Sequence, residues 1–118
     1  MSINGRFMRL VLFFDLPVTT KQGLRNYRQF VKFLTLEGYI RIQESVFCKL
    51  CINIDSANAE IRRVRLNAPS QGDIRILPIS ERQFQKMIDI NESHSLQESI
   101  TTTNRILVIG GMNDEGEK

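Results

Sequence analysis

The chain has 118 residues, 42% of them hydrophobic, and a formal net charge of +3 from 16 basic and 13 acidic side chains. This length and apolar content predict one compact domain with a modest core. No run approaches the roughly 20 apolar residues of a membrane helix, and the first residues lack the apolar stretch of a signal peptide. We therefore expect a cytoplasmic protein without a membrane partner.

The first predicted element is a near-continuous apolar strand over residues 8–16, a pattern typical of a central strand covered on both faces. Thr19 or Thr20 can cap a helix that runs to about Glu37, and Gly38 supplies its C-terminal stop. The apolar positions of this helix recur at helical spacing: Leu24, Tyr27, Val31 and Leu34.

The next part of the chain favours strands over residues 39–43 and 45–54, with a bulge or bend near Glu44 where the alternation slips. Cys48 and Cys51 lie in the second of these strands, where residues three apart point to opposite faces. The sequence has no second cysteine pair to complete a zinc site. We expect structural cysteines.

A second helix is predicted from an N-cap at Asp55 or Ser56 to about Asn67. Its expected inward residues are Ala57, Ile61, Val64 and Ala68, and its largely outward arginines are Arg62, Arg63 and Arg65. Residues 73–79 then alternate as a strand, and Pro78 places that strand near a sheet edge or a strand end.

Ser80 and Gln83 form a capping box for a short helix that would carry Phe84, Met87 and Ile88. This helix would complete a domain over residues 8–90. The rest of the chain is predicted to be an extension over residues 1–7, a polar connection over 91–104, a strand over 105–111 and a mobile acidic tail over 112–118.

The order of elements predicts an α/β fold of the α+β sandwich type, ferredoxin-like βαββαβ, with an added short helix. Helices would cover one face of the sheet, and dimerisation could cover the other. The C-terminal strand, at the end of a long polar connection, could be exchanged onto the partner of a homodimer.

Several blocks of sequence over about residues 8–110 occur in the same order as in a known protein family. They are residues 8–17 (MRLVLFFDLP), 27–34 (YRQFVKFL), 38–40 (GYI), 43–47 (QESVF) and 72–79 (GDIRILPI). Together these blocks resemble the family of the small CRISPR-associated adaptation protein, the compact partner of the CRISPR integrase, in the style found beside type II-A loci. No single block is specific to this family.

The resemblance implies a ferredoxin-like homodimer that sits between two integrase dimers during spacer acquisition and holds a short duplex of foreign DNA, the prespacer. Members of this family are also described as CRISPR-associated endoribonucleases or endonucleases that depend on a metal. The resemblance therefore leaves two roles open, a DNA-holding scaffold and a Mg²⁺-dependent nuclease. A ferredoxin-like regulatory or RNA-binding module unrelated to CRISPR is a third possibility.

Asp15 stands at the end of the first apolar strand, where a carboxylate either ends the strand before a turn or acts chemically. One such carboxylate is a poor Mg²⁺ site, but two copies at a dimer axis, with waters and a phosphate, could bind the ion and activate water. Asp15 is thus the candidate catalytic and metal-binding residue. Ser45 and Phe47 either lie near it in a dimer cleft or serve a bulge and the core, and His94 lies in the polar connection.

A basic stripe on the first predicted helix is the candidate nucleic-acid-binding site: Lys21, Arg25, Arg28 and Lys32, at spacings of four, three and four. Such a face can contact duplex DNA without reading its bases. The resemblance supports Lys21 and Arg25 most, while Arg28 and Lys32 could equally form a solvated face. The arginines of the second helix could extend this stripe, contact the integrase or be solvated.

Overall fold

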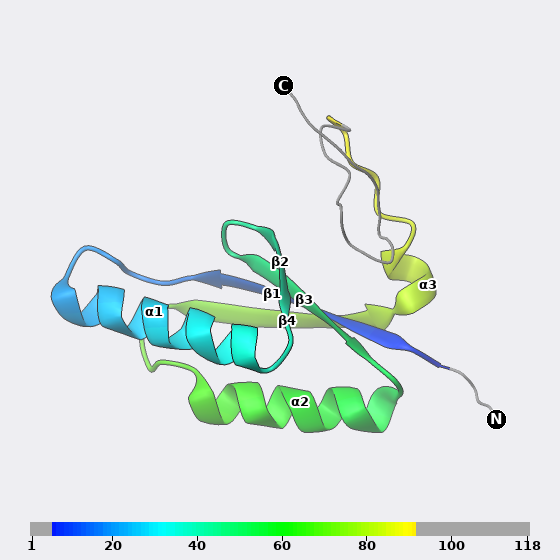
Figure 1. Ribbon diagram of the computed structural model, residues 1–118, viewed down its shortest axis with the longest axis horizontal. Coiled ribbons are helices and arrows are strands. Elements are labelled where there is room, and N and C mark those ends of the chain that lie inside the picture. The colour runs from blue at the N-terminus through cyan, green and yellow to red at the C-terminus, as the bar shows by residue number, and fades with distance from the viewer. Residues whose placement is uncertain (1–5, 92–118) are drawn as a thin grey trace. The chain divides into compact units, whose positions relative to one another are not determined.

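The computed structural model describes residues 6–91 (Figure 1). Its elements are β1 (Met8–Asp15), α1 (Lys21–Leu36), β2 (Ile40–Gln43), β3 (Val46–Cys51), α2 (Ile54–Asn67), β4 (Asp73–Ser80) and α3 (Glu81–Phe84). Residues 6–86 form one compact unit, and residues 87–91 begin a second unit without regular structure in that stretch. The predicted strand over 105–111, the acidic tail, His94 and nearly all of the polar connection lie outside the described residues.

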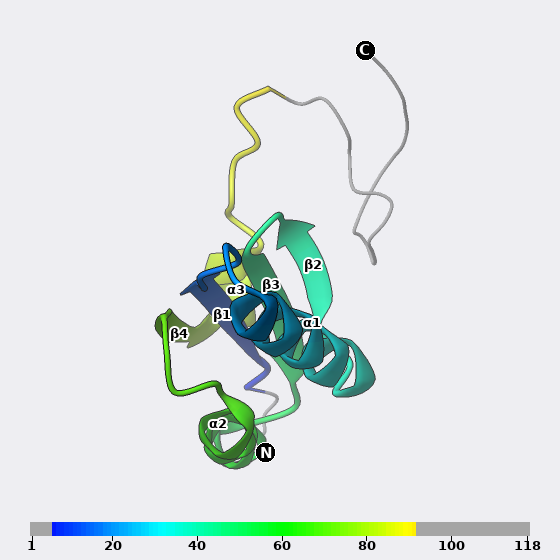
Figure 2. The same ribbon diagram turned by 90° about the vertical axis from the view of Figure 1, so that its left-hand side faces the viewer.

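The four strands form one antiparallel sheet in the order β2-β3-β1-β4, and α1 and α2 lie on the same side of it (Figure 2). This arrangement confirms the predicted ferredoxin-like α+β fold. The strand β1 is central, as its continuous apolar run indicated, and β4, which contains Pro78, is an edge strand. Within residues 6–91, no helix has the length and apolarity needed to cross a membrane.

The core lies between the sheet and the two helices. Leu10, Leu12 and Phe14 point to this side from β1, and the first two are 0% exposed. Of the predicted inward residues of α1, Leu34 is fully buried here and Tyr27 and Val31 are partly buried. The prediction is wrong for Leu24, which is half-buried and borders a surface groove instead of the core cluster. The largest buried side chain of α1 was missed by the sequence pattern: Phe30, which is 1% exposed and meets Phe14 edge to face at 5.5 Å.

Two predicted boundaries are wrong, the end of β3 and the N-cap of α2. The strand β3 ends at Cys51 rather than at residue 54, and α2 begins at Ile54. The N-cap is Asn53, whose Oδ1 accepts a hydrogen bond from the Ser56 amide at 2.8 Å. Asn is as good a cap as Asp or Ser, so the first suitable residue after the strand takes the position.

The slip in alternation near Glu44 corresponds to a tight turn between β2 and β3, and the register shift itself lies between Arg41 and Gln43. At the other end of the sheet, the predicted capping box of Ser80 is confirmed, but α3 has only four residues. Met87 and Ile88 lie beyond its end and are exposed rather than carried on the helix.

The face of the sheet opposite α1 and α2 carries large apolar side chains that remain accessible. Phe13 is 38% exposed, Leu50 46%, Leu77 49% and Ile40 54%. The strand register places all four on the same face, because they align with the odd-numbered positions of β1. The sheet therefore has a second apolar face that α1 and α2 leave uncovered, as the predicted fold requires.

Candidate functional site

Asp15 is the last residue of β1 and is exposed. Its side chain belongs to the same sheet face as Phe13, away from α1 and α2. The strand register pairs it with Asp73 of β4, and Asp73 is held by Arg75, with 3.1 Å between Oδ2 and Nη2. The charge that seemed misplaced in an apolar strand is thus at an open strand end, beside a second carboxylate.

Carboxylate oxygens are the ligands that Mg²⁺ prefers, so Asp15 fits the chemistry of such a site. The structure adds Asp73, which the sequence did not suggest because it is 58 residues away in the chain. Nevertheless, no three metal-ligating side chains of the His, Cys, Asp and Glu types come together among residues 6–91. Among the described residues, Asp15 and Asp73 alone supply too few ligands for Mg²⁺, so the ion would need further oxygens from outside this set, such as water, a second copy of the chain or a phosphate.

The two residues proposed to accompany Asp15 have different positions. The carbonyl of Ser45 accepts a hydrogen bond from the Phe14 amide at 3.1 Å, so its backbone lies next to the strand end. Phe47 is 2% exposed and stacks on Phe14, with 5.8 Å between ring centroids. The packing interpretation is confirmed for Phe47, because its side chain points into the core on the opposite face from Asp15.

The helix α1 presents the predicted basic stripe on its outer surface. Its N-cap is Thr20, whose hydroxyl accepts from the Gly23 amide at 2.9 Å, so the first helical residue is Lys21. We call the stripe the α1 basic face, and its residues are Lys21, Arg25, Arg28 and Lys32, all of them exposed. The first three border a shallow groove of about 310 Å³ together with Leu24 and Gln29.

The α1 basic face has no internal counter-ions. None of its four residues forms an ion pair with another residue of the described chain, and the first turn of α1 contains no acid. The positive end of the helix dipole adds to this charge near Lys21. The structure therefore brings the four predicted nucleic-acid-binding residues together on one surface and leaves their charges open to an anionic ligand.

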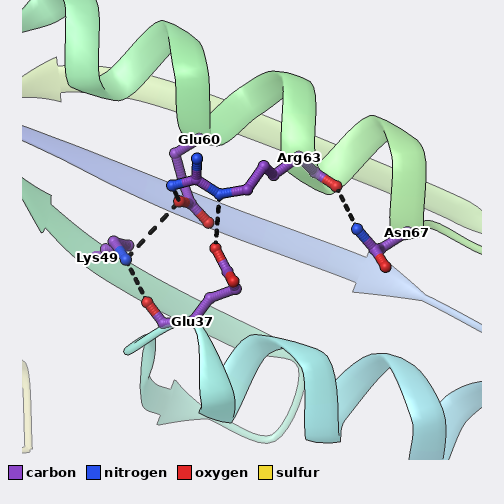
Figure 3. Close-up of polar contacts among 5 residues, drawn as sticks. All are labelled: Glu37, Lys49, Glu60, Arg63 and Asn67. Carbon is purple, nitrogen blue, oxygen red and sulfur yellow. Dashed lines mark hydrogen bonds and ion pairs between the residues drawn. The ribbon is translucent and has the colours of Figure 1, made fainter.

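The most connected polar cluster lies elsewhere, between the two helices (Figure 3). Glu60 of α2 is 1% exposed, and its Oε1 lies 2.5 Å from Arg63 Nη2 and 3.7 Å from Lys49 Nζ. Arg63 also meets Glu37 at 2.9 Å, and Lys49 donates to the Glu37 carbonyl at the end of α1. We call these four residues the interhelical ion network. It joins the C-terminal end of α1 to α2 and to β3.

The position of Glu60 in the sequence is a signal for this network. Glu60 falls at position i+3 from Ala57 and at i−4 from Val64, so it lies on the apolar side of α2. A carboxylate there requires partners. Of the α2 arginines, Arg63 is committed to this network, whereas Arg62 and Arg65 are exposed without a described ion pair.

A second ion pair lies on the other face of the sheet, between Arg9 of β1 and Glu81 of α3. It is bidentate, with distances of 2.7 and 2.6 Å, and the guanidinium also lies over the Phe84 ring. Burial lowers the pKa of Arg9, but the hydrogen bonds to Glu81 raise it overall. By contrast, burial raises the pKa of the neighbouring Cys48 thiol, because it disfavours the charged thiolate. Both cysteines are free and buried, and the strand register places them on opposite faces of β3, as the sequence predicted.

The family model described as CRISPR associated protein Cas2 matches residues 8–87. A protein of Treponema denticola is 37% identical over 103 residues, which are 86% of this chain and all of that protein. A protein of Streptococcus mutans is 43% identical over 84 residues, 71% of this chain and 77% of the relative.

A protein of Acidovorax ebreus is 41% identical over 80 residues, 68% of this chain and 78% of the relative. All three relatives bear the name CRISPR-associated endoribonuclease Cas2. The family match begins at the first residue of β1 and ends just after α3, so it includes both Asp15 and the α1 basic face.

Proposed function

Since this chain belongs to the CRISPR-associated protein Cas2 family, as its sequence blocks predicted, we propose that it is a scaffold of spacer acquisition. In this role a homodimer binds duplex prespacer DNA without sequence specificity and bridges two integrase dimers. The integrase performs the strand-transfer chemistry, and this protein sets the distance between the two sites. The observation that carries the proposal is the α1 basic face.

The dimensions of the α1 basic face suit a duplex backbone. From Lys21 to Lys32 the helix rises about 16 Å, an axial length over which duplex DNA presents about ten phosphate charges. The four exposed side chains can reach phosphates and release the counter-ions condensed on them. They offer no arrangement for reading base edges, so the binding would be independent of sequence.

The accessible apolar face of the sheet supports the homodimer. Phe13, Leu50 and Leu77 lie on one face and are between 38% and 49% exposed. An apolar surface shared by adjacent strands marks a protein contact. A second copy of the chain is its natural partner, because two such faces complement each other. Asp15 lies on this face too, so pairing through it would bring an Asp15 from each copy into one interface.

The second candidate function is a Mg²⁺-dependent endonuclease or endoribonuclease with the Asp15 pair as its metal ligands and catalytic residues. The printed names of the relatives and the exposed strand-end carboxylate favour it. A bound Mg²⁺ would supply an activated water for phosphodiester hydrolysis. Residues 6–91 include no histidine that could act as a general base, which is why the scaffold is our leading proposal.

The test of the scaffold combines charge reversal with removal of the acid. Lys21→Glu together with Arg25→Glu should weaken the binding of a fluorescent duplex by about two orders of magnitude. The slope of log affinity against log salt concentration should fall by about two, because two phosphate contacts are lost. The matched control is Arg62→Glu with Arg65→Glu, which reverses as much charge on α2. Equal losses in the two double variants, or no loss in the first, would contradict the proposed interface.

Asp15→Ala separates the two candidate functions. The scaffold proposal expects duplex binding and spacer acquisition in cells to stay at the level of the unmodified protein, even if metal-dependent cleavage disappears. The nuclease proposal expects spacer acquisition to be lost together with cleavage. Asp55→Ala is the control, because it removes an exposed carboxylate from α2 and leaves both strand-end acids, Asp15 and Asp73, in place.

A further inference from the structure

We propose that Arg41, on β2, is a phosphate-binding residue that extends the α1 basic face onto the edge of the sheet. This inference rests on the proposed binding of duplex DNA and adds a contact that the basic stripe of α1 does not contain. Three observations carry it: the way the guanidinium is held, the lack of a described carboxylate partner, and its place beside α1.

The guanidinium of Arg41 is held by two side chains that the core fixes. In the sheet, Arg41 pairs with Phe47 of β3, and its Cζ lies 4.9 Å from the centre of the Phe47 ring. Its Nη2 donates a hydrogen bond to the Tyr27 hydroxyl of α1 at 3.3 Å. Phe47 is buried, and Tyr27 packs edge to face on Phe14 at 5.9 Å. An arginine oriented in this way loses less side-chain entropy when it binds a ligand.

The charge of Arg41 is uncompensated. The arginines that stabilise the described fold each pair with a carboxylate: Arg9 with Glu81, Arg63 with Glu37 and Glu60, and Arg75 with Asp73. Across the same residues Arg41 has no ion pair, and it is exposed. Only one of its five N–H donors is used by Tyr27, so others can form a fork on one phosphate group.

The position of Arg41 matches the surface that already carries the other cations. Its hydrogen bond to Tyr27 places the guanidinium at the side of α1, and Figure 2 shows β2 and α1 next to each other at this edge. Arg28 lies about 100° further around α1 than Tyr27, at the edge of the α1 basic face nearest to Arg41. A DNA backbone that follows the α1 basic face can therefore meet Arg41 across Tyr27, without a change in the fold.

The experiment uses the full chain and a fluorescent duplex, with binding measured by anisotropy between about 50 and 200 mM salt. Arg41→Ala should weaken binding about tenfold and reduce the salt slope by about one. Arg41→Lys should still weaken it about threefold, because an ammonium keeps the charge but loses the planar fork. Tyr27→Phe keeps the ring and removes the acceptor, so we expect about a twofold loss.

The matched control is Arg62→Ala, which removes from α2 another exposed charge that has no ion pair among the described residues. We expect it to change the affinity by less than about twofold. The inference is overturned if Arg41→Ala and Arg62→Ala weaken binding equally, or if Arg41→Lys binds like the unmodified protein. Thermal unfolding checks that each variant is folded. If the alanine variant is unfolded, Arg41→Lys takes its place, because it keeps a long cationic side chain at this position.

Failure of this inference can be told apart from failure of the proposed function. If the Lys21→Glu, Arg25→Glu variant binds DNA normally, the α1 basic face is not the interface and both ideas fall. If that variant loses binding while Arg41→Ala equals its α2 control, the scaffold proposal stands. In that case Arg41 is excluded as a phosphate contact.

Discussion

The interhelical ion network and the α1 basic face are built from the same kinds of side chain, but they differ in burial and in partners. In the network, Glu60 is 1% exposed, and Arg63 and Lys49 compensate its charge. On the α1 basic face, four cations are exposed and have no counter-ions among the described residues. Charges that are satisfied internally support the fold, whereas a cluster of unsatisfied cations is available to a ligand.

Whether an arginine has an internal ion pair indicates its role better than the arginine content of the chain does. An excess of arginine over lysine only weakly favours a polyanionic partner. Once the structure assigns partners, Arg9, Arg63 and Arg75 are removed from the list of candidates. Arg25 and Arg28 of α1 remain exposed without an ion pair in the described chain, as do Arg62 and Arg65 of α2 and Arg41 of β2.

The first prediction breaks the network at its buried member. Glu60→Ala should lower the free energy of unfolding by about 3 kcal/mol, because it leaves two cations without their shared carboxylate. The loss stays near the lower end of the usual range, since Arg63 is 51% exposed and can turn toward water. Urea unfolding followed by circular dichroism measures this change.

Lys32→Ala is the matched control for Glu60→Ala, because it removes one charge from the unpaired region. We expect its free energy of unfolding to stay within about 0.5 kcal/mol of the unmodified protein. Folded Glu60→Ala should also bind duplex DNA normally at low temperature. A stable Glu60→Ala variant would mean that the network has no structural role, and the contrast between the two regions would be lost.

The fold could be predicted from the sequence because its main signals are local. The apolar run before Pro17, the helical spacing of Leu34 with its neighbours, and the position of Pro78 each determine one element. The N-cap at Asn53 was missed because Asn53, Asp55 and Ser56 are all good caps within four residues. A pattern that ranks these residues equally cannot choose among them.

The candidate site could be predicted only in part, because some of its contacts join different helices and strands. The α1 basic face follows from spacing within one helix. By contrast, the approach of Asp73 to Asp15, and of Arg41 to Tyr27, depends on which strands and helices become neighbours. These contacts join residues 58 and 14 positions apart. Sequence periodicity within single elements contains no information about them.

The second prediction tests whether the outer turns of the α1 basic face belong to the interface or are merely solvated. Arg28→Ala with Lys32→Ala should leave the stability unchanged but weaken duplex binding by about 2 kcal/mol at low salt, with a salt slope lower by about two. Anisotropy at several salt concentrations measures both quantities. If the affinity and slope are unchanged, the functional surface is restricted to the first turns, around Lys21 and Arg25.

The third prediction, which has the smallest expected effect, concerns the stability that the interhelical ion network loses at acidic pH. The hydrogen bond from Arg63 holds the pKa of Glu37 below its ordinary value, although partial burial opposes this. The unfolded chain therefore binds this proton more readily, so the contribution of Glu37 to stability is complete above its unfolded pKa, about 4.3, and is lost as the pH falls through the lower folded value.

Glu37→Gln removes this contribution and should cost less than about 1 kcal/mol at pH 7, because Glu37 and Arg63 are both partly exposed. The difference in free energy of unfolding between Glu37→Gln and the unmodified protein should shrink as the pH is lowered from about 5 to 3. Lys32→Ala should keep a constant offset over the same range, because Lys32 forms no ion pair with a carboxylate of the described residues. A Glu37→Gln difference that does not depend on pH would mean that the Glu37 carboxylate is not stabilised by Arg63. The interhelical ion network would then consist only of Glu60 with its two cations.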